Sequence, residues 1–198
     1  KIITTAEGGM AMTNDDQLAG RMALLRSHGI TRDPALMTHV PDGPWYYQQV
    51  DLGFNYRMTD IQAALGVSQM TRLDQYIERR HALARRYDRL LDGLPVTPPW
   101  QHPDGYSGLH LYVIRLQLGK VGRSHRQIFE SLREQGIGVN LHYIPVHTQP
   151  YYRDLGTATG QFPEADRYYA EAISLPMYSG LTDDQQDRVI DALTGALS

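Results

Sequence analysis

Hydrophobic positions recur at helical spacing in four stretches of the chain, and each stretch begins with residues suited to cap a helix. The first follows Asn14-Asp15 and ends at Gly29. The second begins at a Thr59/Gln62 capping box and continues to Gly93, which is long enough for two helices or one bent helix. Two further helices are predicted to begin at similar boxes, Ser124/Gln127 and Thr182/Gln185.

Apolar runs between these helices predict strands at residues 109–118, 137–143 and 173–175, with helical residues around 164–172. Residues 1–13 predict two short strands joined by a Gly8-Gly9 turn. The alternation of strand and helix from residue 109 onward predicts a compact α/β or α+β domain.

Prolines mark the best boundary between domains. Four of them lie between residues 95 and 105. We therefore expect a first part at residues 1–94, a linker at 95–107 and a small domain at 108–198. The stretch from Thr31 to Asp51 has no periodicity, and irregular loops of that length often serve function. The run Glu78-Arg79-Arg80 is interpreted as a solvated helix face.

Composition narrows the class of protein. The 198 residues carry a net charge of −3, which argues against a general nucleic-acid binder. The absence of cysteine excludes disulfides, thiolate catalysis and cysteine-ligated zinc. No apolar run approaches the roughly 20 residues of a membrane span, and no secretory signal is visible. We expect a cytoplasmic globular protein without membrane contact.

The chain contains only two lysines, Lys1 and Lys120. A deprotonated lysine is a nucleophile toward carbonyl groups, but a lysine at a chain end is ordinarily solvated. Lys1 precedes an Ala6-Glu7-Gly8-Gly9 turn, and this segment resembles the cofactor-lysine segment of the DegT/DnrJ/EryC1/StrS sugar aminotransferases. These are pyridoxal-phosphate (PLP) enzymes of the aspartate-aminotransferase fold type. The resemblance implies that Lys1 carries PLP as the internal aldimine.

Two further segments strengthen the resemblance. Arg26-Ser27-His28-Gly29 matches a helix end of the family, and residues 52–66 match its most recognisable stretch. The match implies that Asn55 reaches the PLP phosphate of the neighbouring subunit, so that a homodimer shares its active sites. Arg57 is a permanent cation suited to the same phosphate. Turn chemistry offers the alternative that Asn55 is a turn residue before the Thr59 cap.

Residues 142–152 resemble the family's segment over the cofactor, which implies that Tyr143 and His147 contact the sugar nucleotide. The alternative for His147 is a loop histidine with its own hydrogen-bond partners. We expect no metal site, because Pro145 prevents His142 and His147 from sharing a helix face and no carboxylate completes a ligand set.

The aromatic residues Trp45-Tyr46-Tyr47 offer a flat face for a sugar or base, or belong to a core. With residues 50–57 they resemble one branch of the family, the enzymes that aminate C4 of a UDP-linked 4-keto-6-deoxy-N-acetyl sugar in pseudaminic acid synthesis. The implied reaction is a transamination from L-glutamate. The alternatives are another nucleotide-linked keto-sugar (dTDP or GDP, C3 or C4) and a non-catalytic sugar-nucleotide-binding or dimerisation fragment. Family dehydratases replace the lysine with histidine, so Lys1 argues against that activity.

The resemblance implies an α/β fold, namely the C-terminal half of a fold-type I PLP-dependent transferase. This half would hold the end of the large three-layer α/β/α domain and a small α+β domain. Relatives carry an N-terminal half that supplies the acid at the pyridine nitrogen, the stacking ring and most of the phosphate cup. We therefore expect this chain alone to lack part of the active site.

Overall fold

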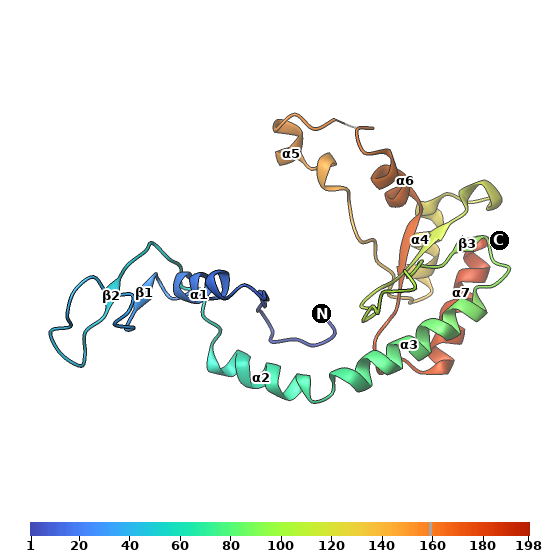
Figure 1. Cartoon of the computed structure of the whole chain (residues 1–198). Helices are drawn as coiled ribbons and strands as arrows, with labels where there is room; N and C mark the ends of the chain where they lie inside the picture. Colours follow the sequence, from blue (N-terminus) through green and yellow to red (C-terminus); the bar gives the residue numbers. More distant parts are fainter. Residues whose placement is uncertain (159) are drawn as a thin grey trace. The chain divides into compact units, whose positions relative to one another are not determined.

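A computed structural model describes residues 1–158 and 160–198 (Figure 1). Contacts divide the chain into two compact units. We call Ile3–Thr71 the N-terminal unit, and Arg72–Ser198 together with Lys1–Ile2 the C-terminal unit. Helices and strands occur in both, as the predicted α/β class requires. Within the described ranges, no helix has the length and apolar character needed to cross a bilayer.

The N-terminal unit contains α1 (Asp16–Leu25), α2 (Asp60–Met70) and a short antiparallel ladder of β1 (Ile30–Thr31) with β2 (Gln48–Gln49). Both helices begin where the sequence predicts. The carboxylate of Asp15 accepts hydrogen bonds from the first turn of α1, and the Thr59 capping box of α2 is complete. The ladder closes the irregular loop and was not predicted.

The two strands predicted within residues 1–13 are wrong. This segment is irregular, and Met10 and Met12 are 83% and 88% exposed. A strand needs a neighbouring strand to pair its N–H and C=O groups, and no strand in the described part of the chain lies beside this one. The strand-like runs on either side of Gly8-Gly9 were therefore insufficient without a partner.

The segment that follows the loop packs through its backbone against the end of α1. The Phe54 N–H donates to the Leu25 carbonyl at 2.7 Å, and the His28 N–H donates to the Phe54 carbonyl at 2.8 Å. Gly53 permits this approach, because a Cβ there would lie 2.3 Å from the backbone nitrogen of Gly29. The helix itself ends at Leu25, before the predicted Gly29.

The C-terminal unit is built on an antiparallel sheet in the order β3–β4–β5. Its strands are β3 (Val96–Thr97), β4 (Tyr112–Leu116) and β5 (Ala172–Leu175). Its helices are α3 (Leu73–Leu90), α4 (His125–Glu134), α5 (Pro150–Asp154), α6 (Pro163–Glu171) and α7 (Asp183–Leu197), with 3-10 turns η1 (Leu118–Lys120) and η2 (Val146–Thr148). The predicted capping boxes at Ser124 and Thr182 are both present.

One face of this sheet and the helices α3, α4 and α7 enclose the hydrophobic core. Along β4, the buried Tyr112, Ile114 and Leu116 alternate with half-buried Val113 and Arg115. This period of two directs alternate side chains to opposite faces of the sheet, so the core lies on one side only.

Helices α3 and α7 lie side by side (Figure 1), and polar contacts fix their register. Arg86 donates to Asp187 at 2.7 Å. The fully buried Gln186 donates to the Leu83 carbonyl at 3.0 Å. Because Gln186 is inaccessible to water, this bond offsets part of the cost of burying its amide.

Residues 137–143 do not form the predicted second strand of the small domain. Only Asn140 bridges to β5, through two backbone hydrogen bonds with Ser174 of 2.8 and 3.3 Å. The Val139 N–H instead donates to the Ile137 carbonyl at 2.8 Å. This tight turn uses the Val139 N–H, which would have to pair with a neighbouring strand in a longer ladder.

The predicted linker lies inside the C-terminal unit, because Val96 of β3 pairs with Leu116 of β4. The contacts divide instead between Thr71 and Arg72, at the break between α2 and α3. That break shows that the long helical pattern is two helices. The division at 1–94, 95–107 and 108–198 stays a prediction.

We expect Gly53→Ala to lower the free energy of unfolding of the N-terminal unit by roughly 1–3 kcal/mol, because the added methyl group forces the backbone apart. Gly20→Ala in α1 is the matched control, since its Cβ would meet open space. It should stabilise the helix by about 0.5–1 kcal/mol. Urea unfolding and exchange of the Phe54 amide measure both effects. A Gly53→Ala protein as stable as the wild type would contradict the close packing at Gly53.

Candidate active site

Lys1 is exposed and belongs to the C-terminal unit. The next residue anchors it, because a Cβ on Gly108 would lie only 3.0 Å from Cγ1 of Ile2. Lys1 also acts electrostatically on His110, two residues beyond this contact. In the described part of the chain, no hydrogen bond or ion pair engages its side chain. The amine predicted to carry the cofactor is therefore chemically available.

The segment at residues 107–110 is held in place by a buried cation. Arg80 is 8% exposed, and its Nη1 donates to the carbonyls of Leu109 (3.1 Å), His110 (3.1 Å) and Met177 (3.0 Å). The Leu109 N–H donates to the Ser107 hydroxyl at 3.1 Å. Leu109 has φ +48°, the left-handed region that residues other than glycine rarely adopt.

The interpretation of Glu78-Arg79-Arg80 as a solvated face is wrong for Arg80. The sequence nevertheless contains a signal that Arg80 is buried. Arg80 lies three residues after Ile77 and three before Leu83, which places it on the apolar face of α3. A charged residue on that face is rare unless it is fully hydrogen-bonded or functional.

Two histidines lie at the start of β4 and beside β5. His142 Nδ1 is 2.8 Å from the Ser174 hydroxyl, and Ser174 pairs with Val113 of β4. Partial burial lowers the pKa of His110, and the positive charges of Arg80 and Lys1 and the nearby His142 lower it further. His110 therefore stays neutral to a more acidic pH than an ordinary histidine. The sequence did not single out His110.

Tyr143 follows His142 and is 61% exposed, with its ring edge-on to the His142 ring at 4.7 Å. No described residue forms a hydrogen bond with its hydroxyl. Contact with a sugar nucleotide stays a prediction.

His147 is placed differently from Tyr143. It is 7% exposed, and its Nε2 lies 2.9 Å from a carboxylate oxygen of Asp166. Its ring packs on Phe162, and its carbonyl accepts a hydrogen bond from Thr157. These contacts match the alternative of a loop histidine with its own partners, so a substrate contact by His147 stays a prediction.

In the N-terminal unit, Trp45 is 71% exposed, so it is not a core residue. A Cβ on Gly43 would lie 2.6 Å from the Trp45 ring, which shows that the indole covers this glycine. The Tyr46 hydroxyl lies 2.6 Å from His39 Nε2, and the Gln48 amide also contacts this histidine. Tyr46 is thus fixed within the loop, while Trp45 presents a flat apolar face.

Asn55 is held by its backbone, and its side chain is unengaged. It forms an antiparallel bridge with Ser27, so it is not the turn residue that turn chemistry suggests. The rings of Phe54 and Tyr56 on either side stack at 4.9 Å. Asn55 and Arg57 are both exposed, and no described residue bonds to their side chains. An amide and a guanidinium are therefore available for an anion.

The predicted site residues fall into two groups. The C-terminal unit contains Lys1, Tyr143 and His147, and the N-terminal unit contains Trp45, Tyr46, Asn55 and Arg57. Within the first group, Lys1 acts electrostatically on His110, which the sequence did not predict. His147 is engaged in its own contact with Asp166.

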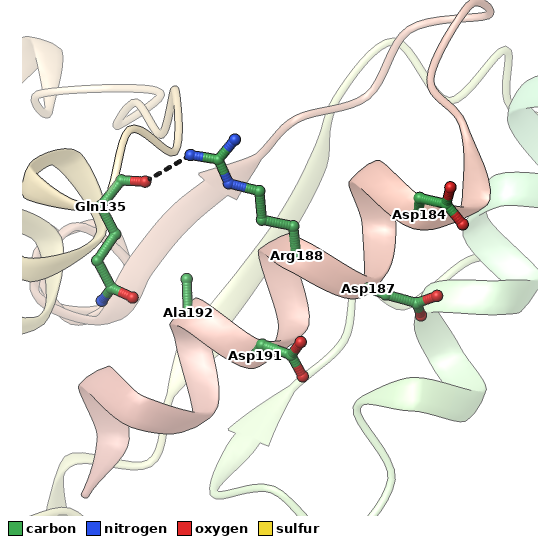
Figure 2. Close-up of a pocket in the computed structure, with 6 residues that line it drawn as sticks. All are labelled: Gln135, Asp184, Asp187, Arg188, Asp191 and Ala192. Atoms are coloured by element: carbon green, nitrogen blue, oxygen red, sulfur yellow. Dashed lines mark hydrogen bonds between the residues drawn. The ribbon is translucent and has the colours of Figure 1, made fainter.

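A hollow of about 410 Å³ lies on α7 beside the end of α4 (Figure 2). Arg188 donates to the Gln135 carbonyl at 3.1 Å, and Asp187 accepts from Arg86. These contacts join α7 to α4 and α3, and they account for Arg188 and Asp187 in the lining without a ligand. Among the described residues, no group of three or more His, Asp or Glu side chains is placed to hold a metal ion.

Residues 1–194 match the DegT/DnrJ/EryC1/StrS aminotransferase family. The chain is 37% identical over 196 residues to the spore coat polysaccharide biosynthesis protein SpsC of Bacillus subtilis. This alignment covers 98% of this chain and 50% of SpsC.

Solved structures agree with this match. PseC of Helicobacter pylori, an aminotransferase involved in the biosynthesis of pseudoaminic acid, superposes with a TM-score of 0.86 at 30% identity. That likeness covers 100% of this chain and 50% of PseC. Spr1654 of Streptococcus pneumoniae in its PLP form superposes with a TM-score of 0.81 at 27% identity, over 100% of this chain and 50% of Spr1654.

The chain thus spans about half the length of the curated relatives it matches. The match nevertheless covers nearly all of this chain, including the segments around Lys1, Asn55 and Tyr143. The chain belongs to the DegT/DnrJ/EryC1/StrS aminotransferase family.

Proposed function

We propose that the protein is a PLP-dependent aminotransferase that transfers the amino group of L-glutamate to the C4 ketone of a UDP-linked 4-keto-6-deoxy-N-acetyl sugar. The observation that carries the proposal is the family match, which includes Lys1. The likeness to PseC, whose pathway is pseudoaminic acid biosynthesis, supports this substrate over other keto-sugars.

The residues present suit PLP. Lys1 offers a primary amine that no described residue engages, as covalent attachment requires. Asn55 and Arg57 offer an exposed amide and a permanent cation, the groups that bind a phosphate. When bound, PLP supplies the aldehyde that accepts an amine and the ring that withdraws electrons from the reacting carbon.

Lys1 has a second task in the proposed reaction. As a neutral amine, its Nζ takes the proton from the α-carbon of the amino donor. It later delivers a proton to C4 of the sugar, so the proton balance of the transamination closes. A positioned acid–base group of this kind accelerates a reaction by about 10²–10⁴-fold.

The proposal includes a homodimer with shared active sites and a cytoplasmic location. Support for the dimer comes from residues 52–66, whose resemblance to the family implies that Asn55 serves the neighbouring subunit. The aromatic face of Trp45 is proposed to stack on the sugar nucleotide, because an exposed indole binds flat rings well.

The wild-type protein, purified at full length, is expected to show the visible absorption band of bound PLP. We expect Lys1→Ala to abolish this band. Transamination should fall roughly 100-fold or more, because the proton carrier is lost. Lys120→Ala is the matched control, since Lys120 is the chain's other lysine and should leave both readouts unchanged. Wild-type protein that binds no PLP, or Lys1→Ala protein with an unchanged band, would refute the proposal.

We expect the protein to aminate a UDP-linked 4-keto-6-deoxy-N-acetyl sugar with a higher kcat/KM than the dTDP- or GDP-linked sugars, and with L-glutamate as donor. Specific contacts to substrate polar groups discriminate strongly against analogues that lack them. The measurement is turnover against a panel of 3-keto and 4-keto sugars on each nucleotide. A 3-keto sugar as the only accepted substrate would rule out the proposed regiochemistry.

We expect Trp45→Ala to raise the KM for the sugar nucleotide about tenfold, with little change in the KM for glutamate, because aromatic stacking is lost. Trp100→Ala is the control, since Trp100 is similarly exposed at 77% but lies in the proline-rich segment. Steady-state kinetics on both substrates separate the effects. Equal effects of the two substitutions would argue against stacking at Trp45.

A further inference from the structure

The C-terminal unit contains a buried positive charge that no described carboxylate balances. Arg80 is 8% exposed, and the hydrogen bonds of its guanidinium go to three backbone carbonyls. Its Nε is buried without a partner. Burial lowers the pKa of Arg80, and no Asp or Glu within residues 1–158 and 160–198 opposes that effect. A buried cation is costly unless a negative charge is near.

Other groups that can donate to an anion gather at the same place. His110 is exposed and directly follows the carbonyl of Leu109 that Arg80 holds. His142 uses Nδ1 toward Ser174, which leaves Nε2 without a bond to a described residue. Arg80, Lys1 and His142 each act electrostatically on His110. Among the described residues, no Asp or Glu forms an ion pair with any of these groups.

The backbone that presents His110 is rigidly defined. Leu109 adopts φ +48° and buries its side chain, and its N–H and carbonyl are both engaged, by Ser107 and Arg80. Backbone strain of this kind persists only where surrounding contacts fix it, and it clusters at ligand sites. The contact of Ile2 with Gly108 holds Lys1 to the same segment.

We propose that His110 and His142, with Arg80 behind them, bind the α-carboxylate of the amino donor. The donor's negative charge would offset the buried guanidinium, and imidazole N–H groups are suited to donate to its oxygens. The α-carboxylate is one bond from the α-carbon whose proton Lys1 removes, so a carboxylate site beside Lys1 agrees with its task. The assignment to the donor rests on the proposed function, whereas binding of a carboxylate does not.

The test uses glutarate, a dicarboxylate with neither an amine nor a ketone, so that it binds without reacting. Glutarate is titrated into full-length protein with isotope-labelled histidine, without added cofactor, while the ring signals are followed by NMR. We expect the His110 and His142 signals to shift saturably, and uncharged glutaramide to leave them in place. His110→Ala should weaken glutarate binding about tenfold or more, because a charge-assisted hydrogen bond is lost.

His102→Ala is the matched control, since His102 is exposed and its Nδ1 faces Asp104 in the proline-rich segment. It should leave the Kd for glutarate unchanged. His142→Gln, which retains a donor, should weaken binding less than His142→Ala. The assignment is overturned if glutarate leaves both ring signals unmoved, or if His110→Ala binds glutarate as tightly as the wild type. It is also overturned if a parallel titration with inorganic phosphate is the only one that shifts the ring signals.

Kinetics connect the site to the reaction. His110→Ala should raise the KM for L-glutamate about tenfold and leave the KM for the sugar nucleotide unchanged. If glutarate binds through His110 but the protein catalyses no transamination, the proposed function fails and the carboxylate site stands. If transamination proceeds and the KM for glutamate is unaltered in His110→Ala, the site is wrong and the proposed function stands.

Discussion

In the C-terminal unit, the path of the backbone at the start of the sheet depends on the guanidinium of Arg80. A single nitrogen of Arg80 on α3 donates to the carbonyls of Leu109, His110 and Met177, which joins a helix to the entry of β4 and to the chain beyond β5. Apolar packing is tolerant of direction, but three convergent hydrogen bonds are not. They fix the path of the backbone where the sheet begins. The placement of His110, and through Gly108 that of Ile2, follows from this contact.

Local chemistry made the helices predictable, and long-range pairing made the strands less so. The capping boxes at Thr59, Ser124 and Thr182 form as the sequence indicates, because each joins groups only three residues apart. A strand depends on a partner elsewhere in the chain. Residues 1–13 have none in the described part of the chain, and residues 137–143 keep only the bridge at Asn140. The strand predicted from the apolar run at residues 109–118 does form as β4, where β3 and β5 flank it.

The residues of the candidate site were likewise predictable only in part. Lys1 and Asn55 were identified because their segments resemble a family, and the structure leaves both side chains unengaged. Arg80 and His110 carry no motif, and their importance arises from burial and backbone geometry that a sequence does not display. Helical spacing places Arg80 on the apolar face of α3, but its charge led to the interpretation that it lies on a solvated face. For His147, the partner Asp166 lies on α6, so no local pattern revealed the pair.

The chain passes between its two compact units twice, once after Ile2 and once after Thr71. Only the crossing after Thr71 joins the two units through long stretches of chain on both sides, because the crossing after Ile2 leads to just two residues. A protease that cut between Thr71 and Arg72 would leave the N-terminal unit covalently linked only to Lys1 and Ile2.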